Sequence, residues 1–125
     1  MSKFDQIRPF YDAEVNAAIR QIVHDPMLEA MMNFAFPNDS VGHWKNLMLH
    51  THSLRDFQIN FIYPALKKVL EKSSEGLSTG GFDQLEPNTA YLFISNHRDI
   101  ILDTSLLNAS LYENGLVMTT SAIGD

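Results

Sequence analysis

The spacing of apolar residues changes along the chain, and this change limits the folds that are open to it. Up to Gly76, apolar side chains recur every three or four residues, the period of an amphipathic helix. Beyond Gly76 they occur in short runs separated by turn-forming residues, which favours strands. The sequence therefore predicts a helical N-terminal region over 1–76 and the first part of an α/β domain over 77–125. The expected fold class is α+β leading into α/β.

Residues typical of helix starts divide the first region. Asp12 is the expected N-cap of the first helix, because its side chain can accept hydrogen bonds from the free N–H groups of the first turn. Asp25-Pro26 reads as an N-cap and first-turn proline for a second helix over 27–34. Both helices would present one apolar face to a core.

Two further helices are predicted before the boundary. One covers 41–50, with Trp44, Leu47 and Met48 expected to face inward. The last stretch carries an apolar stripe that Pro64 interrupts. Proline has no N–H group and clashes with the preceding turn, so a kink or two abutting helices are expected there.

Four methionines in this region allow two interpretations. Met27, Met31, Met32 and Met48 could line a groove for an acyl chain, since methionine adapts to flexible ligands. Ordinary packing between helices is the more common role, and it is the favoured interpretation.

The second region is predicted to place strands around one helix. The order strand–helix–strand implies a right-handed parallel crossover. The run Ala90-Tyr91-Leu92-Phe93-Ile94 is continuously apolar, as in a strand buried on both faces of a parallel sheet. A sheet of two or three strands cannot have both of its faces buried by the rest of this region. We therefore expect a truncated α/β domain whose unpaired edge strands permit dimerisation. A short strand with a turn or bulge is expected over 77–85, and further strands over 90–94 and 116–119. A helix is expected over 101–112, ended by Glu113-Asn114-Gly115.

Charge and composition exclude several classes of function. The net charge of −6 disfavours nucleic-acid binding, which depends on lysine and arginine. Cysteine is absent, which excludes a thiol nucleophile and zinc–thiolate sites, and the spacing of His50 and His52 does not suit a metal. No apolar run approaches the ~20 residues of a membrane span, and the N-terminus does not resemble a signal peptide. We expect a cytoplasmic protein without a metal.

The side chains that could carry chemistry follow the predicted buried strand. Ser95-Asn96-His97-Arg98-Asp99 lies at its carboxyl end, where ligands bind in open α/β sheets. The imidazole of His97 could take a hydroxyl proton while a nearby carboxylate fixes its tautomer. Both Asp99 and Asp103 are candidates for that carboxylate. A plain polar turn is the alternative interpretation of the same residues.

The segment Ser95–Asp103 resembles the signature block of glycerol-3-phosphate and 1-acylglycerol-3-phosphate (lysophosphatidate) acyltransferases. In that family an Asn-His pair ends a strand and an Asp follows, with an apolar helix behind it. The apolar pair Leu106-Leu107 matches the pair that comes next in the family. The segments 4–15, 90–94 and 122–125 resemble a bacterial subgroup of these enzymes, so the resemblance spans nearly the whole chain.

The resemblance implies a role for each residue of the block. His97 would be the general base that deprotonates a glycerol hydroxyl of glycerol 3-phosphate or a lysophospholipid. The alkoxide would attack the thioester of acyl-CoA or acyl carrier protein, which is a co-substrate, and no further cofactor is implied. Asp103 would orient His97 and stabilise the imidazolium. Asn96 would brace the loop, and Arg98 would meet a phosphate or face solvent.

One departure from the family pattern bears on the choice of carboxylate. The family has four residues between His and Asp, whereas five separate His97 from Asp103. On a helix the extra residue rotates the Asp by about 100°, so a looser first turn is required. We favour Asp103 over Asp99 because the leucine pair that follows it keeps the family register.

The resemblance also implies later motifs that bind the phosphate and shape the acyl tunnel. These would lie beyond Asp125, so the 125 residues by themselves are expected to be inactive. In phospholipid biosynthesis such an enzyme would make peripheral contact with the inner membrane. The alternative is a helical docking module that grips a partner such as acyl carrier protein and carries a degenerate catalytic remnant. In that case His97 would lack an acidic partner, and a large apolar face would be exposed.

Overall fold

The computed structural model describes residues 2–122 of the chain. The final residues of the block at 122–125, which contributes to the family resemblance, lie outside the described residues. The chain forms two compact units, Met1–Val69 and Leu70–Asp125. This division falls within a helix, whereas the predicted boundary at Gly76 follows it. Each unit is described by itself.

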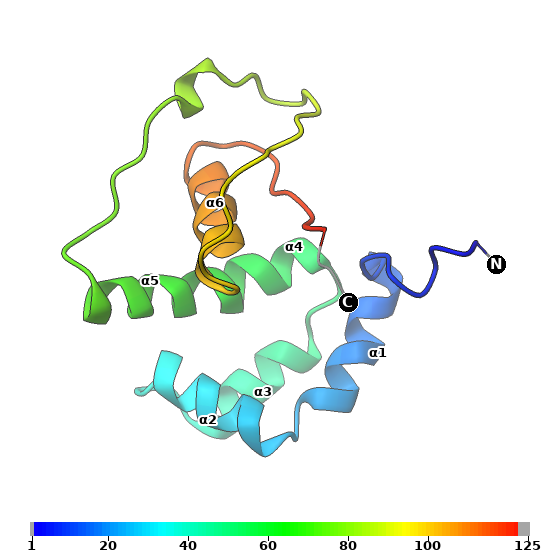
Figure 1. The fold of residues 1–125 in the computed structure, drawn as a ribbon. Helices are drawn as coiled ribbons and strands as arrows, with labels where there is room; N and C mark the ends of the chain where they lie inside the picture. Colours follow the sequence, from blue (N-terminus) through cyan, green and yellow to red (C-terminus); the bar gives the residue numbers. More distant parts are fainter. Residues whose placement is uncertain (1, 123–125) are drawn as a thin grey trace. The chain divides into compact units, whose positions relative to one another are not determined.

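The first unit is built from helices (Figure 1). A π-helical turn, η1, continues α4 and leads directly into α5, which runs on into the second unit. The elements are α1 (Asp12–Ile22), α2 (Pro26–Ala35), α3 (Val41–Leu49), α4 (Leu54–Phe57), η1 (Gln58–Ile62) and α5 (Tyr63–Ser73).

Side chains cap the first turns of α2, α3 and α4. Asp25 Oδ1 accepts hydrogen bonds from the N–H groups of Met27 at 2.8 Å and Leu28 at 3.3 Å, so the predicted cap of α2 is confirmed. The prediction for Asp12 is wrong, because Tyr11 occupies the N-cap position of α1. Asp12 Oδ1 instead accepts the N–H of Leu54 at 2.8 Å and thereby ties α1 to the start of α4.

A bidentate ion pair holds the N-terminal segment against α1. The Arg8 guanidinium donates to both carboxylate oxygens of Glu14, each at 2.8 Å, and its Cζ lies 4.0 Å from the ring centroid of Tyr11. Glu14 also accepts the N–H of Tyr11 at 2.8 Å. The hydrogen bond from Arg8 is the main reason that the pKa of Glu14 falls to about 2.

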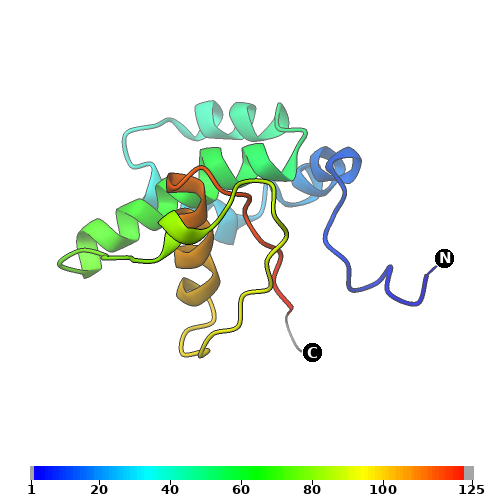
Figure 2. The same ribbon diagram turned by 90° about the horizontal axis from the view of Figure 1, so that it is seen from above.

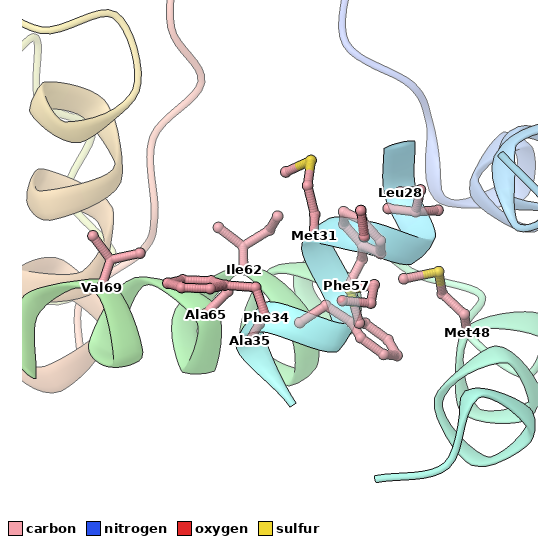
Figure 3. A pocket seen from close by; sticks show the side chains of 12 residues that line it. Leu28, Met31, Phe34, Ala35, Met48, Phe57, Ile62, Ala65 and Val69 are labelled. Atoms are coloured by element: carbon pink, nitrogen blue, oxygen red, sulfur yellow. The ribbon is translucent and has the colours of Figure 1, made fainter. Parts of the chain in front are cut away.

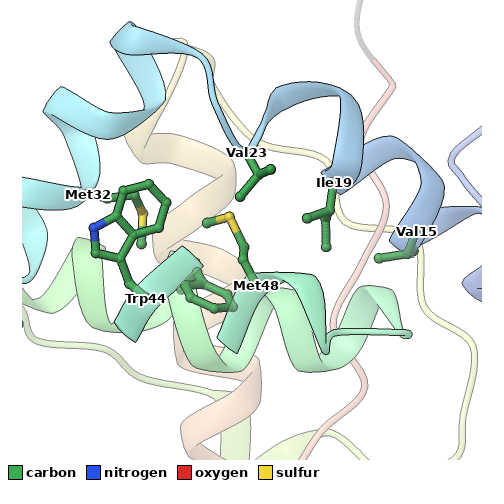
Figure 4. Packing of buried hydrophobic residues seen from close by; sticks show 7 residues of the cluster. Val15, Ile19, Val23, Met32, Trp44 and Met48 are labelled. Atoms are coloured by element: carbon green, nitrogen blue, oxygen red, sulfur yellow. The ribbon is translucent and has the colours of Figure 1, made fainter. Parts of the chain in front are cut away.

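The core of the first unit lies between α1, α2, α3 and η1 (Figure 4). Trp44 and Met48 stand one turn apart on α3 and are both fully buried, as predicted. The inward placement predicted for Leu47 is wrong, since 48% of it is exposed. Leu47 is rotated by about 100° from Met48 around the helix, and the inward face is already taken. The core cluster comprises Val15, Ile19, Val23, Met32, Trp44, Met48 and Phe61.

Truncating Met48 should destabilise this unit strongly. Met48 is fully buried, so Met48→Ala leaves a cavity, and we expect the free energy of unfolding to fall by about 2–5 kcal/mol. Met27 is 74% exposed, so the matched variant Met27→Ala should change it by less than about 0.5 kcal/mol. Urea unfolding followed by Trp44 fluorescence measures both. Equal losses in the two variants would contradict this core.

The interruption predicted at Pro64 takes the form of a π-helical turn. The N–H of Tyr63 bonds to the carbonyl of Gln58, five residues earlier, instead of the residue four positions back. Pro64 follows at once and cannot donate a hydrogen bond. The change of register precedes the proline, and the helix continues through it as α5.

The second unit does not contain the predicted sheet. Within residues 77–122 the structure has no strand, so the expected fold class of α+β leading into α/β is wrong for the described residues. The dimer expected along open strands therefore has no sheet edge to form on in this part of the chain. Figures 1 and 2 show residues 74–101 as coil apart from the short 3-10 turn η2 (Phe82–Gln84), which leads to α6 (Leu102–Glu113).

The missing strands have a physical explanation. A strand is stable only when neighbouring strands satisfy its backbone groups, and no backbone hydrogen bond joins 90–94 to another described segment. Leu92 and Ile94 are accordingly 86% and 87% exposed. In the segment 116–119, a backbone N–H group is bonded to a side chain and not to a neighbouring strand. Asn108 Oδ1 accepts the N–H of Thr119 at 2.7 Å.

The end of α6 is a Schellman motif. The N–H of Gly115 bonds to the carbonyl of Tyr112 at 3.0 Å, and the N–H of Leu116 bonds to that of Leu111 at 2.9 Å. Gly115 has a φ of +70°, which glycine adopts without a steric penalty. The predicted stop at Glu113-Asn114-Gly115 is confirmed.

Replacing Gly115 by alanine should weaken the second unit. Gly115→Ala forces a Cβ into the left-handed region, which costs about 1–2 kcal/mol. A Cβ added at Gly80 would meet no other atom within 4 Å, and its φ is not left-handed, so Gly80→Ala is the matched control. That variant should be neutral within about 0.5 kcal/mol. Hydrogen exchange of α6 amides, compared between the variants, measures the difference. Unchanged protection in Gly115→Ala would contradict this account.

Candidate functional site

The candidate site occupies the turn that leads into α6. Residues 95–99 form no helix or strand, and α6 begins at Leu102. Residues 98–101 thus form a loose turn ahead of the helix, and Asp103 lies in the first turn of α6.

One carboxylate oxygen, Oδ2 of Asp103, contacts three residues of the turn. Asp103 Oδ2 accepts the N–H of Arg98 at 2.6 Å and the N–H of Asp99 at 2.9 Å. The Nδ1 atom of His97 lies 3.1 Å from the same oxygen. The structure therefore brings together the predicted pair of His97 and Asp103.

Asp99, the rival carboxylate, has a different partner. Its Oδ1 accepts the N–H groups of Ile101 at 2.8 Å and Leu102 at 2.7 Å. Ile101 is the N-cap of α6 and Leu102 its first residue, so Asp99 closes the turn that immediately precedes the helix. Asp99 is therefore engaged in that turn, and the carboxylate next to His97 is that of Asp103.

The electrostatics of the turn favour an ionised Asp103. The N–H groups of Asp99 and Arg98 are the largest causes that lower the pKa of Asp103, and the neighbouring His97 lowers it further. A charged Asp103 accepts a hydrogen bond from Nδ1–H, which would leave Nε2 of His97 as the unprotonated nitrogen. The His97 side chain is 66% exposed, so the ring is open to solvent.

The two remaining predicted residues of the block face solvent. Asn96 and Arg98 are exposed, and no hydrogen bond joins their side chains to other described residues. The backbone of Arg98, not its guanidinium, takes part in the turn. The side chains of both residues would be available to a ligand that approaches His97.

Sequence reasoning missed one residue that shapes this unit. Asn108 accepts the backbone N–H of Thr119 at 2.7 Å and its hydroxyl at 3.1 Å, and its Nδ2 donates to the Thr119 carbonyl at 3.3 Å. These bonds fasten the segment after α6 to the helix. The only signal in the sequence is an asparagine at the centre of a predicted helix, where asparagine competes with the helical backbone.

Among residues 2–122, no three side chains of the kinds that ligate metals lie close enough together to hold an ion. Within the same residues, no helix has the length and apolar content needed to span a membrane.

Comparisons with protein-family models, curated proteins and solved structures give no match to this chain.

Acid titration of Asp103 tests the geometry of the turn. Because the folded chain lowers the pKa of Asp103, this carboxylate stabilises the fold at pH values above the ordinary carboxyl pKa of about 3.9. That stabilisation is lost as the pH falls through the lower pKa of the folded state. Carboxyl ¹³C NMR of labelled aspartate should therefore give Asp103 a midpoint below its ordinary value.

The variant His97→Ala separates the causes of this shift. Backbone N–H groups contribute more than the imidazole does, so most of the lowering should persist without His97. A pKa of Asp103 that returned to the ordinary value in His97→Ala would contradict the turn described here.

Proposed function

We propose that His97 and Asp103 form the base and its orienting acid in an acyltransferase. The enzyme moves a fatty acyl group from acyl-CoA or acyl carrier protein to a glycerol hydroxyl of glycerol 3-phosphate or a lysophospholipid. Phospholipid biosynthesis is the corresponding pathway, and the location is the cytoplasm, with peripheral contact at the inner membrane. The single observation that carries the proposal is the 3.1 Å separation of His97 Nδ1 and Asp103 Oδ2.

The reaction would need no covalent acyl-enzyme. Nε2 of His97 accepts the hydroxyl proton as the oxygen attacks the thioester carbonyl carbon. The tetrahedral intermediate collapses, the carbon–sulfur bond breaks, and the imidazolium returns its proton to the thiolate. The products are an ester and a free thiol. Asp103, kept ionised by two backbone N–H groups, stabilises the imidazolium during the reaction.

The position of His97 also separates this proposal from the docking alternative. A degenerate remnant would leave the imidazole without an acidic partner, whereas a carboxylate oxygen lies within hydrogen-bond distance of it. The ring is also exposed instead of buried among apolar side chains, as a base that meets a substrate requires. Both features favour the catalytic proposal.

The surroundings of the turn bear on the activity of the 125 residues alone. Leu92, Ile94 and Ile100 are each at least 86% exposed on the segments next to His97. Within the described residues of the second unit, these side chains form no enclosed acyl site. Acyl transfer to an alcohol requires that water be excluded from the thioester. We therefore propose that the 125 residues by themselves do not catalyse acyl transfer.

A thiol-release assay of the natural gene product tests the proposal. We expect thiol from acyl-CoA or acyl carrier protein in the presence of glycerol 3-phosphate or a lysophospholipid. In His97→Ala the rate should fall by about 10²–10⁴-fold, the usual contribution of a general base. His52→Ala, which changes an exposed histidine of the first unit, is the matched control and should keep the full rate.

Two results would count against the proposal. Equal rates in the wild type and His97→Ala would remove the imidazole from the reaction. Thiol release that did not depend on any acceptor alcohol would indicate a thioesterase. The isolated 125-residue chain is assayed alongside, and release above background that His97→Ala abolishes would overturn its expected inactivity.

A further inference from the structure

The first unit contains an apolar cavity beside its packed core. The cavity has a volume of about 420 Å³ and lies among α2, α3, α4, η1 and α5, and every residue that lines it is apolar. Known ligand sites span roughly 300–1,000 Å³, and an engineered apolar cavity of about 150 Å³ already binds benzene. This space is therefore large enough for an organic ligand.

The cavity has a buried floor and an exposed rim. Met32, Met48 and Phe61 belong to the core and are at most 5% exposed, so they close its inner end. Met31 and Ile62 line the same cavity and are 62% and 44% exposed. Figure 3 shows side chains of α2 on one side and those of η1 and α5 on the other. A ligand could therefore enter from solvent and reach the core.

The π-helical turn forms part of the cavity wall. Phe61 and Ile62 both belong to η1, and Ala65 and Val69 continue the wall along α5. A π turn adds a residue to the helical repeat, so it shifts the side chains of η1 relative to those of a regular helix. Such turns often occur at functional sites. Here the π-helical turn contributes Phe61 to the buried floor of the cavity and Ile62 to its exposed rim.

The chemistry of the lining selects the kind of ligand. A bound water needs two to four polar partners, and this lining offers no polar side chain. A polar or planar heterocyclic ligand would lose hydrogen bonds on entry without replacing them. An unbranched aliphatic chain loses none, and methionines such as Met31 and Met48 can adjust their shape to it.

The size of the cavity argues against a protein segment as the occupant. A helix with its side chains is about 10 Å across, so two turns of it exceed 420 Å³. A methylene group fills nearly the same space as a water molecule, about 30 Å³ in the liquid. The cavity would hold one chain on the order of ten carbons.

We propose that this cavity is a binding site for a single aliphatic chain on the order of ten carbons, whose polar head remains in water at the rim. The inference does not rest on the proposed acyl transfer, because it uses residues of the first unit only. It would hold even if His97 had no catalytic role.

Calorimetric titration of the 125-residue chain with octanoate, nonanoate, decanoate and dodecanoate tests the site below their micelle concentrations. We expect one molecule per chain. Affinity should rise about fourfold for each added methylene until the cavity is full and then level off. Methyl NMR of labelled methionines locates the ligand, because Met31, Met32 and Met48 should shift while Met118, in the second unit, should not.

Filling the cavity provides the decisive variant. Ala65 lines the cavity, so Ala65→Leu should reduce decanoate affinity by at least tenfold. Ala17 lies exposed on α1 and does not line it, so the matched control Ala17→Leu should bind as the wild type does. Ala30→Leu provides a second filling variant should Ala65→Leu fail to fold, as judged by circular dichroism.

Several outcomes would overturn the inference. These are absence of decanoate binding, equal binding in the filled and control variants, or shifts that include Met118. Self-association of the free chain that Ala65→Leu abolishes and decanoate does not affect would show instead that a second copy covers the cavity.

Discussion

A single carboxylate oxygen of Asp103 holds together the turn in which the catalytic histidine is proposed. Asp103 Oδ2 accepts two backbone N–H groups and lies 3.1 Å from the imidazole of His97. The backbone bonds lower the pKa of Asp103, and the same oxygen lies beside Nδ1 of the imidazole. The carboxylate of Asp103 therefore determines both the backbone of the turn and the position of the His97 ring.

The two units are stabilised by different interactions. In the first, side chains from three helices and η1 interlock around Trp44 and Met48, and burial supplies most of the stability. In the second, Leu111 and Leu116 are buried, and hydrogen bonds define both ends of α6. Asp99 closes the turn before α6, Gly115 ends the helix, and Asn108 holds the segment that follows. The proposed base, His97, therefore lies in a turn before α6 that hydrogen bonds hold in shape.

Local signals predicted the start of α2 and the end of α6. The cap at Asp25 and the stop at Gly115 depend on atoms a few residues apart, and both are found. Signals that require distant partners failed. The run 90–94 has the composition of a buried strand, yet the described residues offer nothing for it to pair with. Periodicity alone places Leu47 in the core, although the core has room for only one side of α3.

The sequence by itself determined where α2 begins and where α6 ends, and it placed a histidine and two aspartates within a few residues of one another. Those features follow from short-range hydrogen bonds, which the order of residues encodes directly. Only the three-dimensional structure distinguished the two aspartates, which have the same chemistry: Asp103 lies beside His97, whereas Asp99 accepts the N–H groups of Ile101 and Leu102. It alone also made the cavity, because the space between helices depends on how their side chains fit together.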